Sequence, residues 1–132
     1  MGLAVDGRRL AVGTRTEVWP LRNAPDIAPR IEPAGHHDAC YLPRSCHVTG
    51  DIGIHEMAWA GEELWAVNTR FSCLCTLHPD YSFVPRWRPP FVTALAPEDR
   101  CHLNGLALAE DVRGLLAPRY ATAFAETDTL TA

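Results

Sequence analysis

Short apolar runs alternate with Gly- or Pro-containing turns along this chain, and one such pattern is repeated. Residues 55–70, HEMAWAGEELWAVNTR, form two apolar runs joined at a glycine, and residues 3–15, LAVDGRRLAVGTR, form a similar pair. The two copies are offset by 54 residues, and a third places Leu106 at 49 residues after Met57. Intervals near 50 residues are typical of propeller blades, in which each repeat is a four-stranded antiparallel sheet.

The repeats therefore predict an all-β fold, a partial β-propeller of about two and a half antiparallel four-stranded blades. We expect a single domain with blade one at about residues 2–50, blade two at about 53–88 and an incomplete blade three, with two strands, at about 102–128. The strands expected in blade two are 55–60, 64–70, 73–78 and 82–88. Those expected in blade one are 3–6, 9–15, 17–23 and one further strand within 39–50.

Two segments qualify this pattern. The continuously apolar run at 64–67 is typical of a strand covered on both faces. Pro85, in contrast, places the strand that contains it, 82–88, at an outer edge. Residues 106–116 are rich in Ala, Leu, Glu and Arg and precede Pro118, so a short helix is an alternative there to the hairpin that the repeat favours.

Two and a half blades are too few to close a propeller, which typically has about 4 to 8. The apolar sides of the terminal blades would then be left bare. We therefore expect that the chain is a truncated portion of a longer protein or that it covers those sides by forming a homo-oligomer.

Long phrases of the sequence carry a family resemblance. DACYLPRSCHVTGDIGIHEMAW, ELWAVNTRFSCLCTL, YSFVPRWRPPFVTALAPEDRCHLNGLAL and RYATAFAETDT closely resemble a bacterial family of conserved hypothetical proteins, domain of unknown function 4915. The resemblance covers residues 2–129 and implies a longer, complete propeller of which this chain is the N-terminal portion. It implies no established activity and supplies no catalytic residue.

The amino-acid composition and the missing motifs argue against several classes of function. The chain has 132 residues, a net charge of −4, and 12 scattered arginines with no lysine, so no basic stripe is present to bind nucleic acid or an anionic membrane surface. It contains no apolar run near the ~20 residues that span a bilayer and no export signal, which predicts a cytoplasmic protein. The motifs of common nucleotide-binding and nucleophile-elbow enzymes are absent.

Polar residues stand where the innermost strands are expected to begin: His55 and Glu56 in blade two, and His102 and Asn104 in blade three. The repeat alignment makes His55 and Asn104 equivalent, so both are expected at one end of a central channel. Glu56 and Asn104 are similar to the Glu and Asn of metal-dependent lactonase propellers, and their oxygens suit Ca²⁺ or Mg²⁺. His55 or His102 would assist as a base. The alternative is that both histidines cap strand ends and bond to the adjoining blade.

Further candidates lie on blade two. Asn68, Thr69 and Arg70 end its second strand and are predicted to line a surface pocket or to form a strand-end network. Trp87, between two arginines on the outer strand, is a candidate anchor for a partner or simply covers the sheet edge.

The five cysteines suggest one further hypothesis. Cys73, Cys75 and His78, with Cys101 and His102, could form a zinc site, although the spacing is not that of structural zinc sites and buried reduced thiols are the alternative. Cys40 and Cys46, six residues apart, are expected on one face of one strand and in the core.

Three functional hypotheses follow. The first is a binding or scaffold module whose partner is a protein or a small molecule, and the second is a metal-dependent lactonase- or esterase-like hydrolase with Glu56 and Asn104 as metal ligands. The third is a degraded remnant without a function. Whether the protein is an enzyme, and whether it holds any cofactor, stays open at this level.

Overall fold

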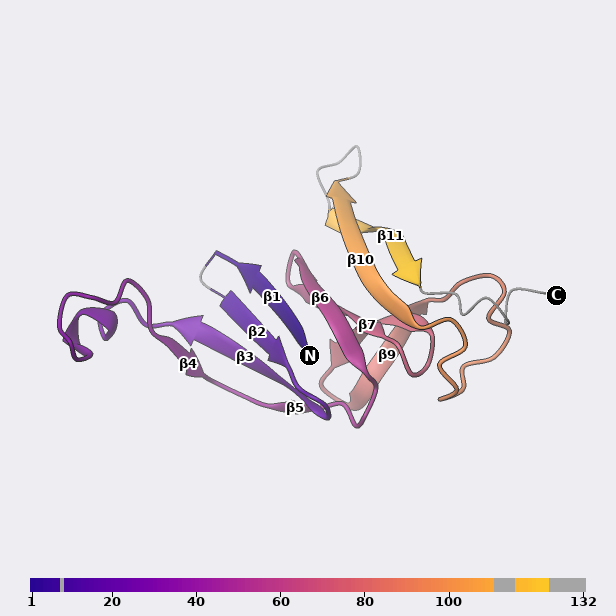
Figure 1. The fold of residues 1–132 in the computed structure, drawn as a ribbon, viewed down its shortest axis with the longest axis horizontal. Coiled ribbons are helices and arrows are strands. Elements are labelled where there is room, and N and C mark those ends of the chain that lie inside the picture. The colour runs from indigo at the N-terminus through magenta and orange to yellow at the C-terminus, as the bar shows by residue number, and fades with distance from the viewer. Residues whose placement is uncertain (8, 111–115, 124–132) are drawn as a thin grey trace.

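The computed structural model describes residues 1–7, 9–110 and 116–123, in which three antiparallel sheets stand side by side (Figure 1). We name the sheets blade one, blade two and blade three. Blade one holds β1 (Gly2–Asp6), β2 (Arg9–Gly13), β3 (Glu17–Asn23), β4 (Tyr41–Pro43) and β5 (His47–Val48). Blade two holds β6 (Ile54–Ala60), β7 (Glu63–Asn68), β8 (Cys73–His78) and β9 (Tyr81–Trp87). Blade three is the hairpin of β10 (Leu103–Glu110) and β11 (Leu116–Ala123).

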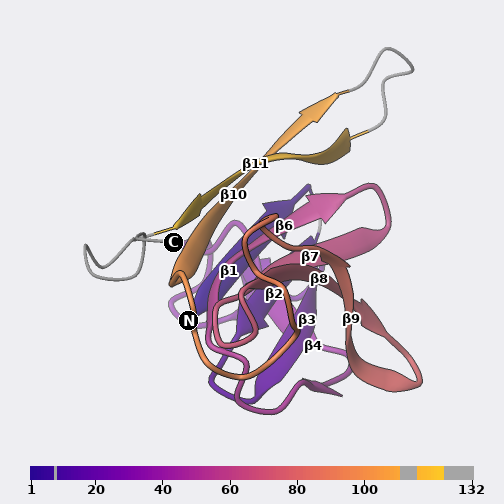
Figure 2. The same cartoon turned by 90° about the vertical axis from the view of Figure 1, so that its right-hand side faces the viewer.

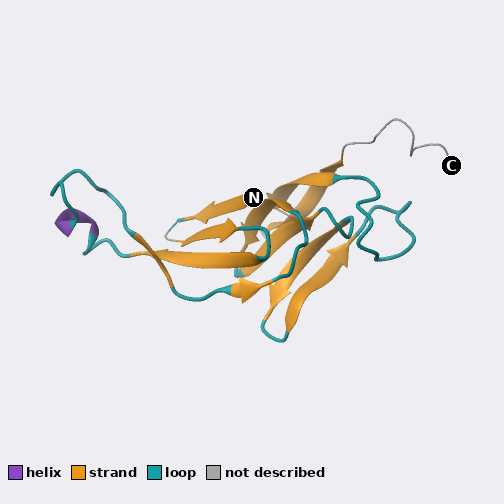
Figure 3. Cartoon of the chain, turned by 60° about the horizontal axis from the view of Figure 1, so that its bottom comes forward, coloured by secondary structure: helices purple, strands orange, loops and turns teal. Residues whose placement is uncertain are grey.

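The order of the strands confirms the predicted fold class, all-β with antiparallel sheets, and is consistent with a partial propeller-like fold. The first strand of each sheet packs against the first strand of the next, β1 on β6 and β6 on β10. Only a short 3-10 helix, η1 (Ala28–Arg30), interrupts the strands and loops of the described residues (Figure 3). Among those residues, none of the helices has the length and apolar character needed to cross a bilayer.

The hairpins β1–β2 and β6–β7 are paired in the same register at an offset of 54 residues. Their matched cross-strand pairs are Leu3–Val12 with Met57–Ala66 and Val5–Leu10 with Trp59–Leu64. Both turns contain a glycine with positive φ, +52° at Gly7 and +61° at Gly61, a conformation that a side chain disfavours. The sequence repeat is therefore a repeat of structure from Leu3 and Met57 onward, while β6 has a register shift before Met57 that β1 lacks.

The contact between blades one and two joins small residues to large ones. Blade one presents Gly2, Ala4, Ala11 and Gly13, all buried, and blade two presents apolar side chains that include Ile54 and Met57. A Cβ atom added at Gly13 would lie 3.1 Å from the Ile54 Cγ2 atom and 3.2 Å from the Met57 side chain. The glycines therefore let the two sheets approach closely.

Blade two is covered on its other face as well. Val67 and Leu74 lie in a second cluster with Leu103 and Leu106 of β10, and the connection between β9 and β10 adds the buried Val92. The Thr69 hydroxyl donates a hydrogen bond to the Leu103 carbonyl across this junction. The prediction that the run at 64–67 is covered on both faces is confirmed.

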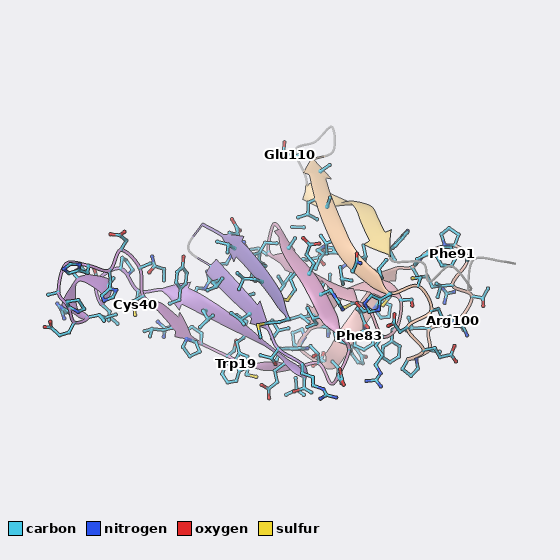
Figure 4. All side chains as sticks on the ribbon, viewed as in Figure 1. Trp19, Cys40, Phe83, Phe91, Arg100 and Glu110 are labelled. Atoms are coloured by element: carbon cyan, nitrogen blue, oxygen red, sulfur yellow. The ribbon has the colours of Figure 1, made fainter. Side chains whose placement is uncertain are left out.

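Two sequence predictions for blade one were wrong. The expected strand within 39–50 is two short strands, β4 and β5, which pair with opposite ends of β3. The gap falls opposite the middle of β3, where Pro20 has no amide hydrogen to donate. Cys40 and Cys46 consequently precede two different strands, the first half-buried (Figure 4) and the second exposed, so neither lies in the core.

The alternatives at 106–116 are resolved in favour of the hairpin. Leu103–Glu110 and Leu116–Ala123 are paired antiparallel strands, so the helix interpretation is wrong for the described part of this segment. Residues 111–115, and the last part of predicted blade three at 124–128, lie outside the described residues. Figure 2 shows the hairpin at the edge of the stack, with blade two on one side of it.

Candidate functional site

The starts of the inner strands bring the two candidate histidines together. His55 is the second residue of β6, and His102 directly precedes β10. Their ring centroids are 5.0 Å apart at an interplanar angle of 77°. Because β1 begins at the same end, the N-terminal ammonium group of Met1 is close enough to act on His55 electrostatically. Sequence reasoning placed His55 and His102 at strand starts, and the structure places them edge to face.

The loop before β10 fixes the position of His102. The Asp99 carboxylate lies 2.7 Å from the His102 Nδ1 atom, and the Asp99 backbone N–H donates to the Arg70 carbonyl at 2.9 Å. Asp99 and His102 both have positive φ, 47° and 44°. Non-glycine residues rarely adopt this conformation, and strained backbone of this kind is concentrated at functional sites.

A pocket of about 350 Å³, which we name the mouth pocket, opens beside this pair. Its size is at the lower end of the range for small-molecule sites, roughly 300–1,000 Å³. Three loops and the start of β6 contribute to it. Its lining residues are Asp51, Gly53, His55, Thr69, Arg70, Pro97, Glu98, Asp99 and His102.

The protein environment lowers the pKa of His55. Desolvation is the largest cause, and the positive charges of His102 and of the N-terminus act in the same direction, while the Asp99 carboxylate opposes them. His55 therefore favours the neutral form near pH 7, in which one ring nitrogen donates a hydrogen bond and the other accepts one.

Charged side chains surround the imidazoles. The Asp51 carboxylate lies 3.2 Å from the Arg70 guanidinium and 3.0 Å from that of Arg15, and the Glu98 carboxylate lies 2.7 Å from Arg100. The pocket thus offers both donors and acceptors, with carboxylates in the majority. A ligand with a strong negative charge would be repelled by them.

The predicted binding residues of the β7 end divide into two roles. Thr69 and Arg70 line the mouth pocket, as the sequence suggested for a pocket at this strand end. Asn68 does not line it, since it is fully buried and its Oδ1 atom accepts the Phe71 backbone N–H at 3.0 Å. The Asn68 side chain therefore stabilises the turn that follows β7, in which Arg70 lies.

The proposed metal ligands lie outside the mouth pocket. The Glu56 Oε2 atom accepts the backbone N–H of Leu106 at 2.8 Å, a bond between blades two and three. Asn104 is half-buried on the neighbouring strand β10. Within residues 1–7, 9–110 and 116–123, no group of three or more His, Cys, Asp or Glu side chains is arranged to hold a metal ion. A metal at Glu56 and Asn104 stays a prediction.

The cysteine and histidine residues of the zinc hypothesis are divided between two interfaces. Cys73 and Cys75 pack toward blade one, whereas Cys101 packs with blade three. Burial raises the pKa of Cys73 to about 12 and that of Cys75 also. His78, at the far end of β8, lies beside Asp80. The structure thus favours the alternative of buried reduced thiols for these three cysteines.

The Arg-Trp-Arg segment lines a second pocket, of about 360 Å³, with Leu95 on its other side. Arg86 is held there by Glu63, at 2.7 Å, and by stacking over Trp65 at 4.7 Å from the ring centroid. Trp87 is 44% exposed. A role as a partner anchor stays a prediction for Trp87.

Sequence reasoning missed the acidic residues of the mouth pocket. Asp51 precedes blade two and Asp99 follows it, and the folded chain brings both into one pocket with the histidines. One signal was present, because Asp99 precedes His102 by three residues within EDRCH, a spacing at which a tight loop brings two side chains together.

Fold and site together define the class: an all-β, propeller-like protein with a polar pocket at the junction of two blades. The chain belongs to the family described as "Domain of unknown function (DUF4915)", whose sequence model matches residues 1–132. This confirms the resemblance noted in the sequence. A search of curated proteins and a search of solved structures each gave no significant match.

Proposed function

We propose that this protein is a binding module and that the mouth pocket is its site for a small, polar, uncharged molecule rich in hydroxyl or amide groups. The observation that carries the proposal is the edge-to-face pair of His55 and His102, with Asp99 bound to the second ring, in a pocket of about 350 Å³. The positive φ values of Asp99 and His102 support it, since backbone of this kind is concentrated at functional sites.

The ligand class follows from the charges. Asp51, Glu98 and Asp99 would oppose an anion. Each of these carboxylates already lies beside a partner, Arg70, Arg100 or His102, so none of them is left to hold a compact cation. A neutral His55 adds one donor and one acceptor. Hydroxyl and amide groups satisfy such a mixed set without carrying a net charge into it.

The test is a titration of the ¹⁵N-labelled protein with a panel of monosaccharides, polyols and small amides, followed by amide chemical shifts. Binding is expected to shift the amides of His55, Arg70 and His102 in a saturable way. The shifts should be lost in the double variant His55→Ala/His102→Ala and kept in His78→Ala, which removes a histidine of blade two outside the pocket. An unresponsive pocket across the panel, or equal binding by the double variant, would contradict the proposal.

The second candidate function is the metal-dependent hydrolase. One observation favours it: the Glu56 carboxylate reaches β10 at Leu106, two residues after Asn104. A Ca²⁺ or Mg²⁺ ion held by Glu56 and Asn104 would polarise a lactone or ester carbonyl, with His55 or His102 as base. Calorimetric titration with CaCl₂ and MgCl₂ tests this candidate. Binding that is lost in Glu56→Gln would support it, and the absence of heat above dilution would contradict it.

A further inference from the structure

The outer strand of blade two is irregular at the Arg-Trp-Arg segment. Strand β9 lies at the edge of its sheet, where β8 is its one neighbour among the described strands. The register sets Pro85 of β9 opposite Cys75. The next pair is Trp87 with Leu74, so Arg86 is an extra residue in β9, a β-bulge. Bulges of this kind are over-represented next to functional sites, where they change the direction of a side chain.

A pocket of about 360 Å³, which we name the bulge pocket, opens at this irregularity. Its lining residues are Cys73, Pro85, Arg86, Trp87, Arg88 and Leu95. Four of these are apolar, and two of the four keep open surface, since Trp87 is 44% exposed and Leu95 41%. The Cys73 thiol is uncharged near pH 7, because burial raises its pKa to about 12. The bulge pocket therefore has walls against which an apolar group can pack.

The charges that line the bulge pocket are all positive. Arg86 and Arg88 contribute to it, and no carboxylate of the described residues does. The mouth pocket differs in this respect, because three carboxylates line it. An acidic ligand group is therefore attracted to the bulge pocket and repelled by the mouth pocket.

Both guanidinium groups keep hydrogen-bond donors for a ligand. Arg86 donates to the Glu63 carboxylate at 2.7 Å and to the Thr76 hydroxyl at 3.3 Å, but both bonds come from its Nη1 atom. Stacking over Trp65, at 4.7 Å from the ring centroid, helps to hold this guanidinium in place. Within the part of the chain that the structure describes, the Arg86 Nε and Nη2 atoms and the Arg88 side chain donate no hydrogen bond. Adjacent free N–H groups of a guanidinium match the oxygens of a carboxylate or phosphate.

We propose that the bulge pocket binds a small organic anion, in which a carboxylate or phosphate group is attached to an aromatic body. The acidic group pairs with Arg86 and Arg88, and the aromatic body packs on Trp87 and Leu95. An aromatic body is favoured over an aliphatic one because it also stacks on the exposed indole ring. The bulge pocket shares no lining residue with the mouth pocket, so this site is independent of the function proposed above.

The test follows the indole N–H signals of the ¹⁵N-labelled 132-residue chain during titration. The chain has four tryptophans, and the Trp87 signal is the one that Trp87→Phe removes. The titrants are two matched pairs, indole-3-acetate with indole-3-acetamide and phenyl phosphate with phenol. Both anions are expected to shift the Trp87 signal in a saturable way. Each neutral analogue should bind at least about tenfold more weakly, because it lacks the charged acceptor for the arginines.

Arg88→Gln should weaken the binding of both anions at least about tenfold. Circular dichroism establishes that the variant is folded, which is expected because the Arg88 side chain donates no hydrogen bond within the described residues. The matched control is Arg30→Gln, which removes an exposed arginine of η1 and changes the net charge by the same amount. Its affinity for the anions should equal that of the wild-type chain.

A Trp87 signal that neither anion shifts would overturn the proposal, as would equal binding by Arg88→Gln or by the neutral analogues. Inorganic phosphate is the last control. If it shifted the Trp87 signal at the same concentrations as phenyl phosphate, the aromatic body would have no part in binding and the proposed ligand class would be wrong. The backbone amides of His55 and His102 should stay unshifted throughout, which separates this result from the test of the mouth pocket.

Discussion

Blades one and two are built on one repeat, but only blade two is covered on both faces. Met57 is 3% exposed and the equivalent Leu3 is 58% exposed, although both belong to hairpins of identical register. The difference shows that the repeat determines which way a side chain points, whereas the neighbouring sheet determines whether it is buried. The following predictions test this comparison, beginning with the largest expected effect.

The replacement Met57→Ala should lower the free energy of unfolding by about 2–5 kcal/mol, because it removes a packed side chain and leaves a cavity. The equivalent Leu3→Ala should change it by less than about 0.5 kcal/mol at dilutions where chains are separate. Urea unfolding at several protein concentrations measures both. If the two variants lost equal stability in the dilute limit, the difference between the blades would be disproved.

A smaller loss of stability is expected at Gly13, the glycine of blade one that faces the Met57 side chain. Gly13→Ala places a methyl group 3.2 Å from the Met57 side chain and should cost about 1–3 kcal/mol by overpacking. Met57→Ala removes one of the two close contacts of the methyl group and leaves the other, with Ile54 at 3.1 Å, so the two changes should cost less together than the sum of their separate effects. Urea unfolding of the single and double variants gives the coupling. An additive double variant would mean that blades one and two do not press together at this point.

The hydrogen bond from the Leu106 N–H to the Glu56 carboxylate, which joins blades two and three, should contribute less to the free energy of unfolding. Glu56→Ala leaves the Leu106 N–H without its acceptor and should cost about 1 kcal/mol, since the carboxylate is exposed to solvent. The control is Glu62→Ala, which removes an exposed ion pair with Arg9 and should cost less than about 0.5 kcal/mol. Thermal unfolding compares the two. An equal or smaller loss for Glu56→Ala would show that the bond does not join the blades.

The smallest effect concerns pH. Because the pKa of His55 is lowered in the folded chain, the unfolded chain binds more protons as the pH falls through about 6.5, and folding stability falls with it. Above that range this contribution is absent. His55→Gln should therefore reduce the loss of stability between pH 7.5 and pH 5.5. Urea midpoints at the two pH values provide the measurement. An unchanged loss in His55→Gln would show that His55 does not titrate differently in the folded chain.

The sequence predicted the strands of blade two to within a residue or two, because alternation, turn glycines and the repeat all agree there. It failed at Cys46, where Pro20 on the partner strand interrupts the pairing, an effect visible only once the register is known. His55 and His102 were identifiable from their place before inner strands. Asp51 was not, because its position in the pocket depends on the packing of blades. Glu56 was recognised as important, but the structure gives it a bond to the backbone of blade three.

Cysteine labelling, resolved by site with mass spectrometry, tests most directly whether blade two is covered on both faces. Cys75 reports on the contact with blade one, Cys101 on the contact with blade three, and the exposed Cys46 is the internal reference. The account predicts that iodoacetamide modifies Cys46 quickly in native buffer and reaches Cys75 and Cys101 only at the rate of unfolding, with all three reacting in urea. Modification of Cys75 and Cys101 in native buffer at the rate of Cys46 would contradict it.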